Sequence, residues 1–256
     1  MGVGRYTPTT AVHGDIGWTP VIVKQWQSVF SHWNRLRNLD NDRLNRKVLV
    51  WADSFGGPNK RNWNFKIKDK FKECDILESY VLNNDTSNFS FIKNTICDKI
   101  FNAYLSKWHT DLNRTTALRG NGLNKLRVYR QFKHSFNTEQ YMLINMPISA
   151  RSAYAKFRCG VAPIRVETGR YEHLPLESRT CVCCPTEVEN EEHVLLVCPL
   201  YDDIRDNLFR KLNYFNFQNL SNHDKLSVIL GAIDNIDLCA KTCKDILDRR
   251  RRFLYQ

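Results

Sequence analysis

The sequence lacks the features of an exported or membrane-spanning protein. No basic start is followed by an apolar stretch, so no secretory leader is predicted. No run approaches the roughly 18 apolar residues that a membrane span needs. The nine cysteines are an odd number, and outside a secretory setting they do not indicate a disulfide framework. We therefore expect an intracellular chain with reduced cysteines and no membrane segment.

Catalytic motifs are also missing. The sequence has no phosphate-binding loop, no serine-hydrolase elbow and no paired-histidine protease motif. The stretch Val50–Ser54 faintly resembles the Tyr-Ala-Asp-Asp turn of polymerases, but that chemistry needs two or three carboxylates around paired Mg²⁺ ions. Asp53 stands alone on a predicted helix, so we expect no catalytic residues and no independent enzyme activity.

The sequence does contain one group of potential metal ligands. Cys181 and Cys184 are separated by two residues, and His193 and Cys198 follow at spacings of eight and four. Three thiolates and one imidazole are a ligand set that tetrahedral Zn²⁺ takes in structural sites. We predict a zinc knuckle in which a loop carries the first pair and about one helical turn separates the second pair.

Other ligand choices remain open on sequence alone. Cys183 could replace Cys184 or Cys181, and His173 lies upstream within reach of a loop. Reduced cysteines could also pack simply as small apolar side chains. Cys239 and Cys243 are four residues apart, which favours burial on one helix face over a second metal site.

Positive charge is concentrated in one part of the chain. The formal net charge is +11, and residues 113–170 hold eleven Lys and Arg against Glu139 and Glu167, an excess of nine. The predicted nucleic-acid-binding residues are Arg114, Arg119, Lys125, Arg127, Arg130, Lys133, Arg151, Lys156, Arg158, Arg165 and Arg170. Tyrosines and phenylalanines lie among them, and cations with stackable rings are what a single strand of RNA or DNA contacts. The alternative is an ordinary solvated helix face.

The predicted knuckle itself is acidic. Between Pro185 and Asp206 seven carboxylates stand against Arg205 alone, so phosphates would be repelled there. Glu191 and Glu192 would also suit the positive end of a helix that begins near His193. We therefore expect the zinc unit to position the neighbouring basic segment rather than to contact nucleic acid first.

Apolar periodicity predicts a mainly α fold: a bundle-like helical region with a small irregular zinc knuckle before the C-terminal helices. We expect three parts, residues 1–147, 148–215 and 216–256. Ser149 should cap a helix that Gly160 ends, and Val161–Thr168 should be a strand or an extended link. The expected helices lie near residues 20–36, 40–55, 63–74, 92–112, 123–136, 149–159, 200–212, 221–230 and 236–252.

Several short motifs occur along the chain in a set order. Near the start stand Gly4-Arg5-Tyr6-Thr7-Pro8, Gly14-Asp15-Ile16-Gly17-Trp18 and Gln25-Trp26. Further on stand Lys125-Leu126-Arg127-Val128-Tyr129, Phe157-Arg158-Cys159-Gly160, residues 164–171, Arg179-Thr180-Cys181 with Cys184, and residues 189–201. Together, over about residues 4–205, they resemble the region downstream of the polymerase in non-LTR (LINE-type) retrotransposon reverse transcriptase polyproteins.

The resemblance implies that this chain is the tail of a larger enzyme whose polymerase and endonuclease are absent. It implies zinc ligands at Cys181, Cys184, His193 and Cys198, and a module that helps to bind template RNA or target DNA. Expected partners are RNA, DNA and a polymerase region of the same polypeptide, in a cytoplasmic ribonucleoprotein or the nucleus. The rival interpretations are a host-adopted, zinc-stabilised protein-interaction module and an inactive retroelement remnant.

Overall fold

The computed structural model describes residues 1–54, 62–76, 89–115, 124–212 and 214–255. Within these residues the chain is mainly helical without a β-strand, and an isolated antiparallel bridge joins Thr180 to Val188. This confirms the predicted mainly α fold, with the Cys/His segment placed before the C-terminal helices. None of the helices in the described ranges is long and apolar enough to cross a membrane.

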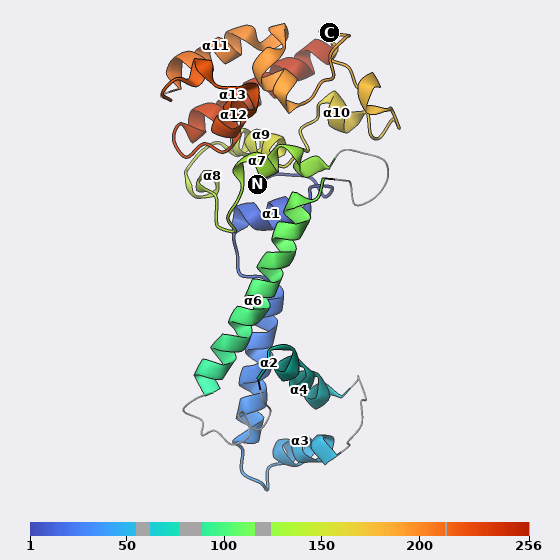
Figure 1. The fold of residues 1–256 in the computed structure, drawn as a ribbon, viewed down its shortest axis with the longest axis vertical. Coiled ribbons are helices and arrows are strands. Elements are labelled where there is room, and N and C mark those ends of the chain that lie inside the picture. Colours follow the sequence, from blue (N-terminus) through green and yellow to red (C-terminus); the bar gives the residue numbers. More distant parts are fainter. Residues whose placement is uncertain (55–61, 77–88, 116–123, 213, 256) are drawn as a thin grey trace. The chain divides into compact units, whose positions relative to one another are not determined.

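Contacts divide the chain into two compact units. Unit 1 combines Met1–Trp18 with Trp108–Gln256, and unit 2 is Thr19–Lys107. The expected divisions after residues 147 and 215 do not separate compact units. The reason is that α9 (Ile148–Arg158) packs against α13 (Ile236–Leu254), so the segments on both sides of these boundaries share one core (Figure 1).

The described residues of unit 2 form α2 (Val21–Arg37), α3 (Leu44–Ser54), α4 (Trp63–Glu73) and the first part of α6 (Phe89–Asn113) (Figure 1). Some of the apolar positions that predicted these helices meet in a core that includes Phe30, Ile67 and Phe71, each at most 1% exposed. The apolar positions of α3 that were expected to face inward are wrong, because Leu44, Val48 and Trp51 are exposed and Leu49 faces the core instead. Within this core the Trp33 indole N–H donates a hydrogen bond of 2.9 Å to the side-chain oxygen of Asn64.

Four local patterns in unit 2 also carry expectations: Pro20 in the first turn of a helix, Asp40 or Asn41 as the cap of the next helix, Gly56–Pro58 as its stop, and Asn83–Asn88 as a polar loop. Pro20 is the N-cap residue of α2 rather than a residue of its first turn. The turn before α3 is closed by a hydrogen bond of 3.1 Å from the Arg43 N–H to the Asp40 carbonyl. The expected stop at Gly56–Pro58 and the expected polar loop Asn83–Asn88 lie outside the described residues.

Unit 1 contains the remaining elements. They are α1 (Thr9–Ile16), η2 (Lys125–Arg127), α7 (Tyr129–Phe132), α8 (Gln140–Leu143), α9, α10 (Arg165–Thr168), η3 (Leu176–Ser178), η4 (His193–Val197), η5 (Pro199–Tyr201), α11 (Asp202–Lys211), η6 (Phe217–Asn219), α12 (Asn222–Leu230) and α13. Most of them are short. The long helices α9 and α13 carry the core of this unit, which extends to both sides of the Cys/His segment.

Two expected elements of unit 1 differ in the structure. The segment expected as a helix near residues 123–136 is a turn of 3-10 helix, η2, followed by the short α7. The Asn124 side chain caps η2 by accepting a hydrogen bond of 2.8 Å from the Leu126 N–H, and the backbone becomes extended at Lys133. Val161–Thr168 is not a strand, because its second half forms α10.

Both ends of α9 can be compared with the sequence. The helix begins at Ile148 after Pro147, so Ser149 is not its cap. Gly160 follows the helix with a φ of +64°, as its expected role as a stop requires. A Cβ at this position would lie 1.9 Å from the Lys125 carbonyl oxygen, so close approach of η2 also requires glycine.

The C-terminal helices confirm the sequence patterns. Ser221 caps α12, since its hydroxyl accepts a hydrogen bond of 3.2 Å from the Asp224 N–H. Cys239 and Cys243 are fully buried on α13, and burial raises the pKa of both thiols. They belong to the core where α13 packs against α9, as their four-residue spacing predicted.

A buried ionic network joins the N-terminal segment to the rest of unit 1. Arg158 is 1% exposed, and its guanidinium lies 3.0 Å from Asp15 and 2.7 Å from Glu139. The hydroxyls of Tyr129 and Tyr141 donate to the two Asp15 oxygens at 2.8 and 2.6 Å. Asp15 thus receives bonds from three elements, which fixes α1 against α7, α8 and α9.

We predict that Arg158→Met strongly destabilises unit 1. Removing one partner of a buried ion pair leaves the other charge unpaired, which typically costs about 3–5 kcal/mol. The matched control, Arg165→Met, removes the partly exposed pair with Glu172 and should cost less than about 1 kcal/mol. Urea unfolding, monitored by amide hydrogen exchange in unit 1, measures the free energy of unfolding of both variants. Equal unfolding midpoints for the two variants would contradict the prediction.

Candidate metal centre

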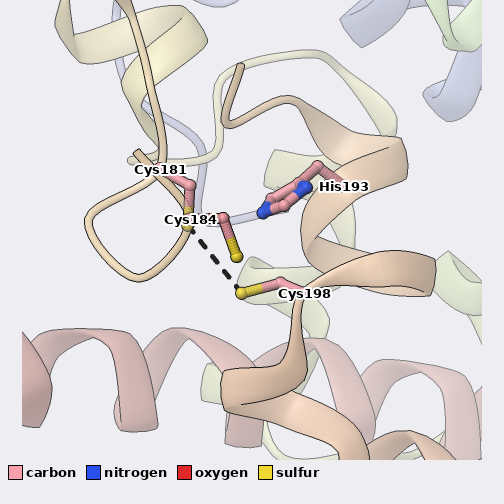
Figure 2. Close-up of side chains that lie close together, drawn as sticks. All are labelled: Cys181, Cys184, His193 and Cys198. Carbon is pink, nitrogen blue, oxygen red and sulfur yellow. Dashed lines mark hydrogen bonds between the residues drawn. The ribbon is translucent and has the colours of Figure 1, made fainter. Parts of the chain in front are cut away.

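Four side chains converge on one point in unit 1. The ligand atoms of Cys181, Cys184, His193 and Cys198 all lie within 4.8 Å of one another (Figure 2). The sulfur atoms of Cys181 and Cys198 are 3.8 Å apart, which is too long for a disulfide bond. A tetrahedral Zn²⁺ with Zn–S bonds of about 2.3 Å separates its sulfur ligands by about 3.8 Å. The spacing therefore fits zinc.

The first pair of ligands lies on a tight turn at the end of the Thr180–Val188 bridge. The Cys181 N–H donates to the Glu187 carbonyl at 2.7 Å, and the Glu187 N–H donates to the Cys184 carbonyl at 3.0 Å. The Cys183 N–H points back to the Cys181 sulfur at 3.4 Å. These bonds place both thiols on the inner side of the loop.

The second pair of ligands flanks η4, a single π-helical turn. Asn190 caps this turn, since its side-chain oxygen accepts a hydrogen bond of 2.8 Å from the His193 N–H. The turn closes with a bond of 2.7 Å from the Cys198 N–H to the His193 carbonyl, five residues back. This wide turn is the expected apolar helical turn, and it brings the imidazole and the thiol to the same side (Figure 2).

The environment of the four side chains suits a bound cation. The Nε2 atom of His193 is buried and has no hydrogen-bond partner among the described residues, as expected for a metal ligand. Burial lowers the pKa of His193, which favours the neutral imidazole that ligates metals. Burial also raises the pKa of the Cys184 and Cys198 thiols, and a zinc ion would supply the charge that stabilises their thiolates.

The structure separates the alternative ligands from this group. Cys183 is the neighbour of two ligands, but its sulfur is outside the set that converges. His173 is exposed at a left-handed turn with a φ of +56°. Within the described residues, the group of four found by geometry is the set that the sequence spacing favoured.

Two buried glutamates tie the knuckle, defined here as residues 180–198, to the rest of unit 1. Glu191 is 1% exposed and pairs with Arg127 at 2.5 Å. Glu189 is fully buried, accepts two bonds of 2.7 and 2.8 Å from Arg250, and also accepts the Arg165 backbone N–H at 2.6 Å. In the sequence Arg250 is one residue of the basic run Arg249–Arg252, and no local motif links it to Glu189.

The predicted nucleic-acid-binding residues differ in their surroundings. Most pair with carboxylates of unit 1: Arg114 with Asp111, Lys125 and Arg170 with Glu167, Arg127 with Glu191, Lys133 with Glu139, Arg158 with Asp15 and Glu139, and Arg165 with Glu172. Arg119 lies outside the described residues. The Lys133 and Arg158 side chains are 2% and 1% exposed, so neither can reach a phosphate, and their assignment is corrected.

Three of the predicted cations have no carboxylate partner among the described residues. The Arg130 guanidinium donates to the Leu126 carbonyl at 3.3 Å, and Arg151 donates to the carbonyls of Tyr141 and Ile144. Lys156 is partly exposed on α9. Hydrogen bonds to carbonyls leave the charge of an arginine uncompensated, so Arg130, Arg151 and Lys156 retain positive charge at the edge of unit 1.

Comparison with known proteins gave no match: no family model, curated protein or solved structure matches this chain. The candidate centre is therefore defined by its own geometry. That geometry is a Cys3His group that could hold one metal ion within a helical protein.

We predict that the purified protein carries about one Zn²⁺ per chain. Cys184→Ala and His193→Ala should each abolish stoichiometric zinc, because each removes one of four ligands. Cys183→Ala is the matched control and should retain the metal, since its sulfur is outside the group. Metal analysis by mass spectrometry after gel filtration provides the measurement. Retention of full zinc by both ligand variants would contradict the assignment.

Proposed function

We propose that this chain is a zinc-stabilised nucleic-acid-binding region that acts as an accessory to the reverse transcriptase of a non-LTR retrotransposon. It would bind template RNA or target DNA during target-primed reverse transcription, in a cytoplasmic ribonucleoprotein or the nucleus. The proposal rests on the Cys3His group, whose four ligand atoms converge at a spacing that fits zinc. The motif resemblance supplies the link to retrotransposons.

The ion pairs support a positioning role for the metal. Zinc would hold the two halves of the knuckle together, and Glu191 would then hold Arg127 at the start of the basic segment. Glu189 fixes the knuckle to α13 through Arg250. The ligands themselves are buried or half-buried, so the metal would shape the neighbouring surface and would not contact phosphates.

The proposal assigns no catalysis to the chain alone. Asp53, the one carboxylate of the stretch that resembles a polymerase turn, lies on α3 in unit 2 and pairs with Lys68 at 2.7 Å. Among the described residues no group of three carboxylates lies close enough together to hold a metal ion. Polymerase chemistry needs such a group. The polymerase would be a separate region of the parent polypeptide.

We expect salt-dependent binding to a single strand. Each neutralised phosphate lowers the slope of log K against log salt by about 0.7, so three contacts from Arg130, Arg151 and Lys156 should give about −2. The double variant Arg130→Ala and Lys156→Ala should flatten the slope by about 1.4. Lys241→Ala, an exposed cation on α13, is the control and should leave it unchanged.

Fluorescence anisotropy with a labelled RNA measures these slopes. A wild-type slope near zero would contradict the proposal. If an acidic polypeptide binds the chain in that case, the chain is a zinc-stabilised protein-interaction module.

We also predict no nucleotide incorporation by the purified chain on a primed RNA template, with either Mg²⁺ or Mn²⁺. The physical reason is that the described part of the chain holds no carboxylate cluster that could bind the catalytic metals. A primer-extension assay with a preparation cleared of contaminating polymerase tests this. Template-dependent extension would contradict the prediction. If the extension persisted in Asp53→Asn, another catalytic group would be responsible. If the extension were lost, the activity would be assigned to Asp53.

A further inference from the structure

We propose that a groove beside α10 binds bases of a single-stranded nucleic acid by stacking them on Tyr6 and Tyr171. The inference deepens the proposed function and rests on it, because it names the ligand class and the site. The groove has a volume of about 270 Å³, and its lining includes Tyr6, Tyr171, Lys125 and Lys156. All these residues belong to unit 1.

Two exposed aromatic rings mark the groove. The side chains of Tyr6 and Tyr171 are 58% and 62% exposed, although they come from distant parts of the chain. Their ring centroids are 6.2 Å apart and their planes are tilted by 55°. Tyrosine rings carry a large apolar surface that folded proteins usually cover. Two neighbouring exposed rings therefore provide a platform on which any base can stack.

Three cations lie beside the rings. Lys125 and Lys156 line the groove, and the Arg5 guanidinium lies 4.7 Å from the centre of the Tyr6 ring. Glu167 also lines the groove, but this carboxylate is 6% exposed on its side chain and pairs with Lys125 and Arg170. The accessible charge at the groove is therefore positive, and Lys156 supplies it without a carboxylate partner among the described residues.

Hydrogen bonds hold the walls of the groove in place. The Thr7 N–H donates to the Gly4 carbonyl at 3.1 Å, which closes the turn that carries Tyr6. The Lys125 ammonium donates to the Tyr6 carbonyl at 3.3 Å, and the Tyr171 N–H donates to the Thr168 carbonyl at 3.0 Å. A site whose backbone is already ordered loses little conformational entropy when a flexible single strand binds.

The chemistry favours a single strand over a duplex or a protein. Stacking requires the face of a base, which a duplex hides, and it tolerates any base because each has a π face. An acidic peptide would use the cations but not the rings. Val161 and Pro163 also line the groove and offer apolar contact to a stacked base.

The test replaces the rings and keeps the cations. The double variant Tyr6→Ala and Tyr171→Ala should weaken binding of single-stranded RNA or DNA of about 10 nucleotides by tenfold or more. The slope of log K against log salt should remain that of the wild type, because no charge is lost. The double variant Tyr6→Phe and Tyr171→Phe keeps the rings and should bind like the wild type. Tyr214→Ala, at a tyrosine that is 50% exposed outside the groove, is the control.

The outcomes separate the groove from the function. If the wild type binds with a salt-dependent affinity and the alanine variant binds equally well, the groove proposal is overturned and nucleic-acid binding stands. If the wild type shows no salt-dependent binding, the proposed function fails first. RNA and DNA strands of matched sequence identify which single strand is preferred. Weaker binding of either strand by the alanine variant supports the groove. If the alanine variant lost as much affinity for duplex DNA as for a single strand, base stacking would be overturned. An equal loss of affinity for an acidic peptide would overturn it too.

Discussion

The buried pair of Arg158 and Asp15 is the interaction on which unit 1 depends. The two residues are 143 positions apart in sequence, yet the guanidinium and the carboxylate meet where both are almost fully buried. Such a pair is stable only when its remaining hydrogen-bonding groups are satisfied. Tyr129, Tyr141 and Glu139 provide those partners, so the N-terminal segment, α7, α8 and α9 are fixed together by one charged centre.

The knuckle follows the same principle on a smaller scale. Of its four acidic residues, Glu187 is exposed and Glu192 is half-buried, but the other two are buried. Glu189 and Glu191 are buried against Arg250 and Arg127, and these pairs connect the Cys3His group to α13 and to η2. A metal that closes the loop and η4 would therefore also constrain the segments beyond them. Through this coupling a bound metal ion would position the neighbouring segments, although all four ligands are directed inward (Figure 2).

The basic segment shows where sequence reasoning stops. Arg127, Arg130 and Lys133 recur at helical spacing, which predicted one basic face, but the segment changes from 3-10 to α-helix and then becomes extended at Lys133. Lys133 consequently turns inward to Glu139. Tyr6 and Tyr171 illustrate the converse. They lie far apart in sequence, so no spacing could indicate that their rings form one exposed pair.

The sequence by itself determined the local features of this protein. Apolar periodicity specified the long helices, and the spacing of three cysteines and a histidine specified the Cys3His group, because both depend on residues within a few turns of one another. Only the tertiary structure decided which charges remain available. Arg127 meets Glu191 across 64 positions and Arg158 meets Asp15 across 143, and such pairs depend on how distant segments pack. Net charge along a segment therefore counted cations that the fold neutralises internally.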